Sequence, residues 1–301
     1  MKTDSLLILG TGALATFFAH RLAASGVEVT LLGTWPEGLA TLQRNGAQIE
    51  GAGSFRVRAT DDPADCRGTK VALVLVKSWQ TERAAQQLTN CLEEDGIAVT
   101  LQNGLGNDAI LFGTLGRKRV ARGVTTLGAT LLAPGIVRFC GDGKVMLEAQ
   151  PRLNPLKRML RVANISTNTV NNIESVIWGK LIVNAAINPL TALLNVKNGE
   201  LLERPSARAL MRELAREAAS VAEALGMALP FRGPERAVEV VARRTAENTS
   251  SMLQDVLRGA PTEVDVINGA VVRLGEKMNV ATPVNRVILA LVKALTVRGK
   301  I

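Results

Sequence analysis

One stretch near the start of the chain decides the fold: SLLILGTGALATFFAHRLAASGVEVTLL, residues 5–32. The apolar run at residues 5–9 predicts a buried strand, residues 13–25 predict a helix, and residues 27–32 predict a second strand. The loop between the first strand and the helix reads Gly10-Thr11-Gly12-Ala13-Leu14-Ala15, which is a GxGxxA sequence. A strand, this loop, a helix and a second strand in that order predict a dinucleotide-binding unit.

The small residues of this loop have steric reasons to be there. Gly10 permits a tight turn, Gly12 lets the backbone approach a pyrophosphate, and Ala15 allows the helix to pack against the strand. The helix that follows offers its unpaired N–H groups to the phosphates. The predicted cofactor contacts from this loop are Gly10, Thr11, Gly12, Ala13 and Leu14.

The end of the second strand bears on the choice between NAD and NADP. NAD sites usually carry an acidic residue there to hold the ribose hydroxyls. This chain has Leu32-Gly33-Thr34 instead, with Glu28 too early and Glu37 too late. The missing carboxylate favours NADP, with Thr34 placed to hydrogen-bond the 2′-phosphate. Arg44 in the next helix is either a second phosphate ligand or, more simply, a solvated surface charge.

The first part of the chain continues to alternate strand and helix signals, as a doubly wound α/β sheet requires. The run VALVLV at residues 71–76 and residues 97–101 predict buried parallel strands, with a helix over residues 81–92 between them. Residues 123–133 and 136–139 flank the turn dipeptide Pro134-Gly135 and predict a hairpin.

The periodicity changes to 3.6 from about residue 172 onward and stays helical. The predicted helices span residues 175–194, 207–225, 234–246, 263–278 and 283–297. We therefore predict an α/β chain of two domains. Residues 1–170 would form a Rossmann domain that binds NADP, and residues 171–301 would form an all-α domain for substrate binding and catalysis.

Composition and charge argue against several other classes of protein. The net charge is +9, from 36 Lys and Arg against 27 Asp and Glu, but aromatic residues are only 3% and Tyr is absent, so nucleic-acid binding is not expected. The positive field suits an anionic cofactor and an anionic substrate. No uninterrupted apolar run approaches the roughly 18 residues of a membrane span. Cys66, Cys91 and Cys140 lie far apart, so we expect a cytoplasmic protein with no disulfide framework and no metal site.

A reductase acting on a ketone needs a general acid near the oxygen, and few residues here qualify. The chain has no Tyr, and its one histidine, His20, lies within the helix after the glycine-rich loop, where packing is its simplest role. A lysine, a carboxylic acid or water remain as donors. Lys180, Asn184 and Asn188 recur every four positions in WGKLIVNAAINP and would share one face of an otherwise apolar helix. Such a stripe implies an internal hydrogen-bond network or a cleft that receives a polar ligand, and burial would lower the pKa of Lys180.

Several blocks in order along the chain resemble the ketopantoate reductase (2-dehydropantoate 2-reductase) family. They are GTGALA, VLVKSWQT around Lys77, LQNGLGN around Asn103, WGKLIVNAAINPLTAL, NTSSMLQDV and PTEVDVINGAVV. The resemblance implies an N-terminal Rossmann domain for NADPH and a helical domain like that of 6-phosphogluconate dehydrogenase, which closes a cleft over the substrate. It implies reduction of 2-dehydropantoate to pantoate, a step of pantothenate biosynthesis.

The resemblance also implies roles for individual residues. Lys180 would be the general acid, and Glu263 would arrange the site around Lys180 and the substrate. Other members of the block pattern would line the substrate or the cofactor: Asn184, Asn188 and Ser251 the substrate, Lys77 the cofactor, and Asn103 both. The chain departs from the family at Thr34, where an arginine often holds the 2′-phosphate.

Simpler readings stay open for these residues. Asn103-Gly104 could form a turn, Ser250-Ser251 could cap a helix, Glu263 could be a first-turn acid, and Lys77 could be a surface lysine. Two other functions also stay open, namely a reductase of another 2-keto acid and a non-catalytic dinucleotide-binding redox sensor. The oligomeric state is undetermined, with a homodimer as one option.

Overall fold

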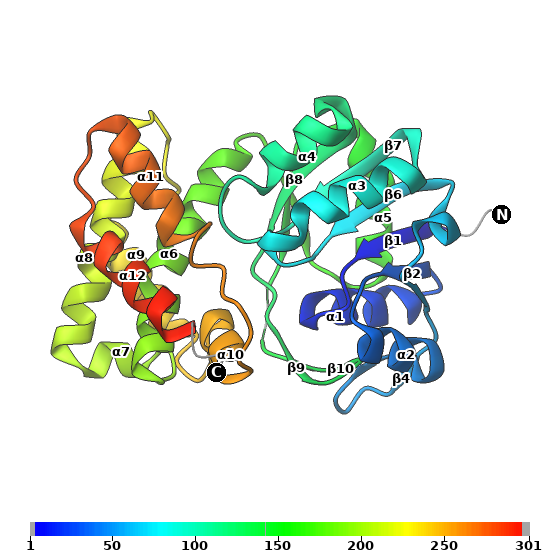
Figure 1. Cartoon of the computed structure of the whole chain (residues 1–301), viewed down its shortest axis with the longest axis horizontal. Helices are drawn as coiled ribbons and strands as arrows, with labels where there is room; N and C mark the ends of the chain where they lie inside the picture. Colours follow the sequence, from blue (N-terminus) through cyan, green and yellow to red (C-terminus); the bar gives the residue numbers. More distant parts are fainter. Residues whose placement is uncertain (1–3, 142, 297–301) are drawn as a thin grey trace. The chain divides into compact units, whose positions relative to one another are not determined.

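The computed structural model describes residues 4–141 and 143–296, and the chain forms two compact units. The first unit comprises the chain up to Gln102 together with Gly106–Ile173. The second comprises Asn103–Leu105 together with the chain from Glu174 onward. Strands and helices alternate in the first unit, whereas the second is helical (Figure 1). This arrangement confirms the predicted fold class.

The first unit is built on an eight-stranded sheet. Its strands are β1 (Ser5–Leu9), β2 (Glu28–Leu32), β5 (Arg58–Thr60), β6 (Thr69–Val74), β7 (Leu92–Thr100), β8 (Val120–Thr125), β11 (Val145–Glu148) and β12 (Thr167–Val170). They lie in the order β12-β11-β8-β7-β6-β1-β2-β5. The six strands from β8 to β5 are parallel, while β11 runs antiparallel to β8. A parallel run whose order reverses at β1 is the doubly wound arrangement.

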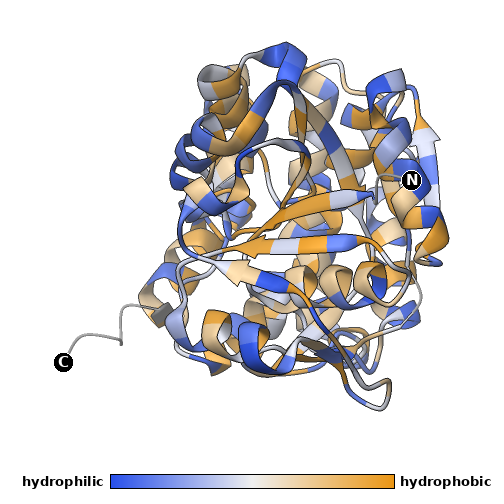
Figure 2. Ribbon diagram, turned by 90° about the vertical axis from the view of Figure 1, so that its right-hand side faces the viewer, coloured by the Kyte–Doolittle hydropathy of each residue, from blue (hydrophilic) through white to orange (hydrophobic). Residues whose placement is uncertain are grey.

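The apolar run of β1 follows from helices that cover both faces of the sheet. Leu6 and Ile8 belong to the hydrophobic cluster that contains the residues of α1 (Ala13–Ala23), and Leu7 and Leu9 belong to the cluster that contains those of α3 (Thr81–Cys91) and α4 (Asn107–Leu115). Since neither face meets water, the strand needs no polar alternation. The central strands are accordingly hydrophobic along most of their length (Figure 2). The remaining helices of this unit are α2 (Pro36–Asn45) and α5 (Asn154–Val162).

A second, four-stranded sheet corrects one prediction. It has the order β4-β3-β10-β9, formed by β3 (Ala47–Ile49), β4 (Ser54–Phe55), β9 (Ala129–Ala133) and β10 (Ile136–Phe139). The hairpin around Pro134-Gly135 is confirmed as the antiparallel pair β9–β10. Its first arm is shorter than predicted, because residues 123–133 divide between β8 in the large sheet and β9 in the small one. The amide of Leu127 donates to the hydroxyl of Thr125 at 3.1 Å, which turns the chain between them.

The second unit contains the helices α6 (Ile173–Leu194), α7 (Glu200–Glu203), α8 (Pro205–Ala224), α9 (Pro234–Arg244), α10 (Ser251–Leu257), α11 (Asn268–Met278) and α12 (Pro283–Thr296). Among the helices that the structure describes, only α6 has the length and hydropathy to cross a membrane, and 67% of its most apolar window is buried. Its apolar side chains, including Trp178, Ile182 and Ala186, belong to the core of this unit.

One predicted helix starts later than expected. Residues 263–278 were predicted as helical throughout, but α11 begins at Asn268. The segment before it is a turn in which the amides of Val266 and Ile267 both donate to the carbonyl of Glu263, at 3.2 and 3.1 Å. The alternative that Glu263 is a first-turn acid is therefore wrong, because it lies a full turn outside the helix.

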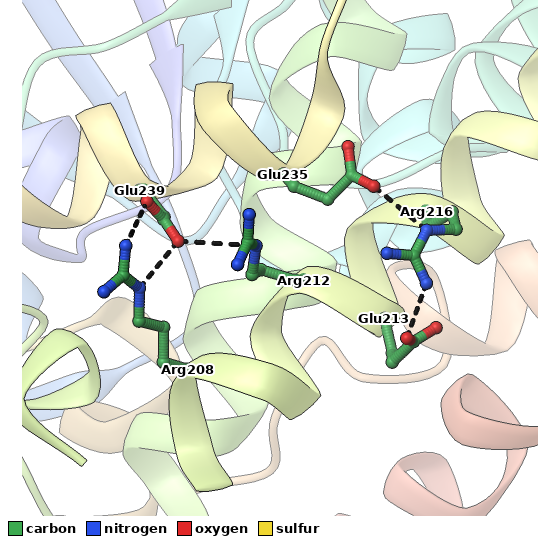
Figure 3. Close-up of polar contacts among 6 residues, drawn as sticks. All are labelled: Arg208, Arg212, Glu213, Arg216, Glu235 and Glu239. Atoms are coloured by element: carbon green, nitrogen blue, oxygen red, sulfur yellow. Dashed lines mark hydrogen bonds and ion pairs between the residues drawn. The ribbon is translucent and has the colours of Figure 1, made fainter. Parts of the chain in front are cut away.

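Several arginines of α8 form ion pairs with acidic residues of α9. Arg208 binds the carboxylate of Glu239 through two nitrogens, at 2.7 and 2.8 Å, and Arg216 reaches Glu235 at 2.9 Å (Figure 3). Arg212 adds a longer contact of 3.5 Å to Glu239. These arginines recur every four residues on one face of α8, so their charge is matched by acids of the adjacent helix.

Candidate active site

The glycine-rich loop lies where the strand order of the sheet reverses. β1 pairs in parallel with β2 on one side and with β6 on the other, and Gly10 directly follows β1. The φ angle of Gly10 is +119°, and an added Cβ would lie 3.2 Å from the backbone of Leu75. A side chain is therefore excluded at Gly10 by both its conformation and its neighbour. Ligands of open α/β sheets bind at such a switch point.

Gly12 differs from Gly10 because space surrounds it. A Cβ added there would meet no atom within 4 Å, and its φ of −82° is open to any residue. Gly12 is the N-cap of α1, where no side chain caps the helix and no acidic residue occupies the first turn. The exposed backbone and the helix N-terminus suit the phosphates of a dinucleotide. The other predicted loop contacts adjoin Gly12 in the chain: Thr11 precedes it, and Ala13 and Leu14 follow it.

Thr34 is exposed two residues after the end of β2, and the strand that ends beside β2 is followed by two acids that the sequence analysis did not predict near this position. The amide of Gly33 donates to the carbonyl of Thr60 at 3.1 Å, so β2 and β5 end side by side. β5 is followed by the exposed acids Asp61 and Asp62. Asp62 caps a short 3₁₀ turn by accepting from the amide of Ala64 at 2.8 Å. Carboxylates beside the second strand favour ribose hydroxyls over a 2′-phosphate, but only the strand pairing could reveal them.

Arg44 lies in the last turn of α2, whereas Thr34 precedes the first turn. Its Nε donates to the carbonyl of Ala40 in its own helix at 3.2 Å, and its side chain is exposed. A ten-residue helix is about 15 Å long. This geometry supports the reading of Arg44 as a surface charge.

Lys77 follows β6 and is partly buried at the start of a 3₁₀ turn, Ser78–Gln80. A polar cluster braces this segment. The amide nitrogen of Gln102 donates to the carbonyl of Val76 at 3.0 Å and to the hydroxyl of Thr81 at 2.8 Å. The Thr81 hydroxyl lies 3.0 Å from Oδ1 of Asn107. Gln102, the first residue of the QNG triplet, is therefore a structural residue that the triplet could have indicated.

The predicted polar stripe lies on α6 in the second unit. Lys180 and Asn184 are partly buried and Asn188 is buried, each one turn from the next. The flanking residues Leu181 and Ala185 face the apolar core. Burial lowers the pKa of Lys180 from its ordinary 10.5 to about 8, and the nearby carboxylate of Glu263 acts in the opposite direction. Lys180 therefore lies within range to exchange a proton near neutral pH.

Glu263 brings a distant part of the chain to this lysine. It is 5% exposed, and its Oε2 accepts a hydrogen bond from Nδ2 of Asn103 at 3.1 Å. Asn103 comes from the short segment that belongs to the second unit although its chain neighbours belong to the first. The structure thus gathers Lys180, Glu263 and Asn103, which are far apart in the sequence, into one polar group.

The turn reading of Asn103-Gly104 holds together with the functional one. Gly104 has a φ of +81°, and an added Cβ would lie 2.5 Å from the carbonyl oxygen of Val266. The amide of Leu105 donates to the same oxygen at 2.9 Å. The turn fixes the segment against the residues after Glu263, which leaves the Asn103 side chain directed at the carboxylate.

The two serines after Thr249 have different roles. Ser250 is the N-cap of α10, because its hydroxyl accepts from the amide of Leu253 at 3.1 Å. It is buried and lies 2.7 Å from the hydroxyl of Thr191 on α6. Ser251 is the first residue of α10 and is exposed. The capping function thus belongs to Ser250, which leaves the hydroxyl of Ser251 accessible to a ligand.

Known families and relatives match this chain along nearly its whole length. Residues 6–152 match the family described as "Ketopantoate reductase PanE/ApbA", and residues 172–296 match "Ketopantoate reductase PanE/ApbA C terminal". The 2-dehydropantoate 2-reductase of Archaeoglobus fulgidus is 36% identical, with 98% of this chain and 99% of the relative aligned. That of Halobacterium salinarum is 34% identical over 96% of this chain and 97% of the relative.

Solved structures give the same picture. A PanE/ApbA family ketopantoate reductase from Ralstonia eutropha superposes with a TM-score of 0.91 at 30% identity, covering 98% of this chain and 99% of that one. A D-mandelate dehydrogenase in a ternary structure with NADH and anilino(oxo)acetate has a TM-score of 0.89 at 26% identity, covering 97% and 98%.

Proposed function

Because the chain belongs to the ketopantoate reductase family, we propose that it reduces 2-dehydropantoate to (R)-pantoate with NADPH, using Lys180 as the general acid. The observation that carries the role of Lys180 is its burial beside Glu263, which in turn is held by Asn103. In this proposal the first unit provides most of the cofactor contacts, and the second binds the substrate, supplies the proton and adds Asn103 to the cofactor contacts. The reaction is a step of pantothenate biosynthesis and would take place in the cytoplasm.

Cofactor binding is assigned to the loop Gly10, Thr11, Gly12, Ala13 and Leu14, with Thr34, Lys77 and Asn103 as further contacts. When bound, NADPH supplies the hydride that adds to the keto carbon. The open space at Gly12 and the uncapped start of α1 support the assignment of the pyrophosphate to this loop. Lys77, partly buried beyond β6, adds positive charge at the same edge of the sheet.

Proton transfer is assigned to Nζ of Lys180. As hydride adds to the carbon, the electron pair of the C=O bond moves to oxygen, and the lysine ammonium protonates the resulting alkoxide. The neutral amine is then reprotonated by water. Glu263 favours the ammonium form, opposing the effect of burial, so that the donor stays charged at neutral pH. Asn184, Asn188 and Ser251 are assigned to the hydroxyl and carboxylate groups of the substrate.

The test is oxidation of the dihydronicotinamide, followed by its absorbance at about 340 nm, with 2-dehydropantoate and with either NADPH or NADH. Faster oxidation with NADPH supports the proposed reaction and the proposed cofactor. Equal or faster oxidation with NADH would retain the reaction but reverse the cofactor preference, and Asp61 and Asp62 beside the second strand would explain it. No oxidation by either cofactor would contradict the proposed substrate.

A second candidate is reduction of another 2-keto acid, which is favoured by the similarity to a D-mandelate dehydrogenase. A panel that includes an aryl 2-keto acid separates the two, because a pocket matched to one side chain discriminates by roughly 10- to 200-fold per methylene-sized difference. A redox sensor that binds the dinucleotide would turn over no member of the panel. It would also have no use for a proton donor at Lys180.

A further inference from the structure

Helix α6 contains a proline, Pro189, directly after Asn188, the last residue of its polar stripe. Pro189 has no N–H group, so the carbonyl of Ala185, four residues earlier, cannot form its usual bond within the helix. Ala185 is fully buried, and an unsatisfied buried carbonyl is costly. That carbonyl needs a donor from elsewhere in the protein.

Asn268 supplies this donor. Its Nδ2 donates to the carbonyl oxygen of Ala185 at 2.9 Å and to Oδ1 of Asn285 at 3.0 Å. Asn268 and Asn285 are both 0% exposed. Nδ2 of Asn285 donates to Glu217 at 2.8 Å, and the backbone amide of Asn285 donates to the same carboxylate at 2.8 Å. A chain of hydrogen bonds thus links α8 and α12, through Asn285 and Asn268, to the carbonyl of Ala185 on α6.

In the chain, one end of the bond between Asn268 and Ala185 lies close to Lys180 and the other lies close to Glu263. Ala185 follows Asn184 directly and lies between Lys180 and Asn188 on α6. Asn268 opens α11 and ends the turn that starts at Glu263, in which the amide of Ile267 donates to the Glu263 carbonyl at 3.1 Å. The Asn268 amide therefore joins the helix that carries the lysine to the turn that carries the carboxylate.

We infer that Asn268 is a positioning residue, which fixes the carboxylate of Glu263 relative to the ammonium of Lys180 by bonding the Ala185 carbonyl freed by Pro189. This inference rests on the proposed function for its link to catalysis. A purely structural amide would change stability alone. Removal of a positioning amide would also change the electrostatic surroundings of Lys180, and the pH dependence of turnover would then shift.

The experiment compares Asn268→Leu, which keeps the side-chain size but removes the donors, with the control Asn198→Leu. Asn198 lies in the same unit, is 8% exposed and donates from Nδ2 to the hydroxyl of Thr245 at 2.9 Å. We expect Asn268→Leu to lower kcat roughly 10- to 100-fold with KM for NADPH unchanged. Its basic limb in the pH profile of kcat should move to lower pH by about half a unit or more, because Lys180 loses the influence of Glu263. Asn198→Leu should lower Tm without moving the limb.

A second substitution tests whether Asn268 acts through its bond to the Ala185 carbonyl. Pro189→Ala restores an N–H group that can bond the Ala185 carbonyl within α6, so adding it to Asn268→Leu should recover Tm but not kcat, because the bond between α6 and the turn of Glu263 is still missing. An unchanged or upward-shifted basic limb in Asn268→Leu, or recovery of kcat on adding Pro189→Ala, would overturn the inference.

A readout independent of turnover separates this inference from the proposed function. The pKa of Lys180 can be measured by pH-dependent labelling with acetic anhydride and mass spectrometry in the wild-type and Asn268→Leu proteins. A wild-type protein without ketopantoate reductase activity would contradict the proposed function. The inference about Asn268 would still stand or fall on whether the labelling pKa of Lys180 decreases in Asn268→Leu and not in Asn198→Leu.

Discussion

The glycine-rich loop of the first unit and the lysine stripe of the second are both polar sites, built in opposite ways. The loop offers main-chain groups and open space at Gly12, and its sequence is contiguous. The stripe offers buried side chains on α6, and its partners Glu263 and Asn103 come from distant parts of the chain. A backbone site depends on where side chains are absent, whereas a side-chain site depends on how burial changes the chemistry of the groups present.

This difference makes the two sites sensitive to different changes. At the loop, an added methyl group blocks a ligand or strains the turn, and the chemistry of the side chain matters little. At the stripe, volume can be kept while one functional group is removed, and that removal decides the outcome.

The largest expected effect is at the stripe, from Lys180→Met. Loss of the ammonium should reduce kcat roughly 100- to 10,000-fold, the usual worth of a general acid. NADPH affinity, which we assign mainly to residues of the other unit, should stay within about threefold of wild type by titration of cofactor fluorescence. Because burial holds the pKa of Lys180 at about 8, below its ordinary 10.5, the charged form is disfavoured in the folded state. The variant should therefore have a raised Tm at pH 7, and near-normal turnover would refute the role of Lys180.

The next effect contrasts two glycines of the loop. Gly12→Ala should leave Tm unchanged, since its Cβ meets open space, but should weaken NADPH binding by roughly tenfold or more because the methyl group occupies the approach of the pyrophosphate. Gly10→Ala should lower Tm as well, because of its φ of +119° and the nearby Leu75 backbone. Thermal unfolding and cofactor titration of both variants check the contrast. Equal loss of Tm in both would contradict it.

A smaller effect concerns pH. The proton donor must be charged, so kcat should fall as pH rises through the Lys180 pKa of about 8. Glu263 raises that pKa, so Glu263→Gln should move the basic limb of the kcat profile to lower pH. Profiles measured with saturating substrate and cofactor from pH 5 to 10 test the sign. A limb that stays in place or moves to higher pH in Glu263→Gln would rule out their electrostatic coupling.

The smallest effect lies outside both sites, in the ion pairs of Figure 3. Arg212 makes one contact of 3.5 Å to Glu239, and its side chain is half exposed. Arg212→Ala should shift Tm by no more than about 2 °C and leave kcat unchanged. A large loss of activity would show that this face of α8 contributes to function.

The contiguous site was predictable from sequence, and the dispersed one only in part. The strand at Ser5–Leu9 and the start of α1 at Ala13 follow from short-range patterns, and the structure has both. The four-residue spacing on α6 also follows from helix geometry. The bond from Asn268 to Ala185 does not, because it joins residues 83 positions apart and depends on the packing of α11 against α6. The same holds for the acids Asp61 and Asp62, which reach the end of β2 only through the pairing of β5.

Membership of Asn103–Leu105 in the second unit has a consequence for the evolution and engineering of this chain. Exchange of the helical part between relatives at residue 173 would look modular, yet it would pair an asparagine from one parent with a glutamate from the other. The turn at Gly104, seated against Val266, would likewise meet a foreign surface. A chimera in which the QNG segment and the helical part come from the same parent would preserve both contacts. We therefore expect functional chimeras to keep these two segments together, although they are separate in the sequence.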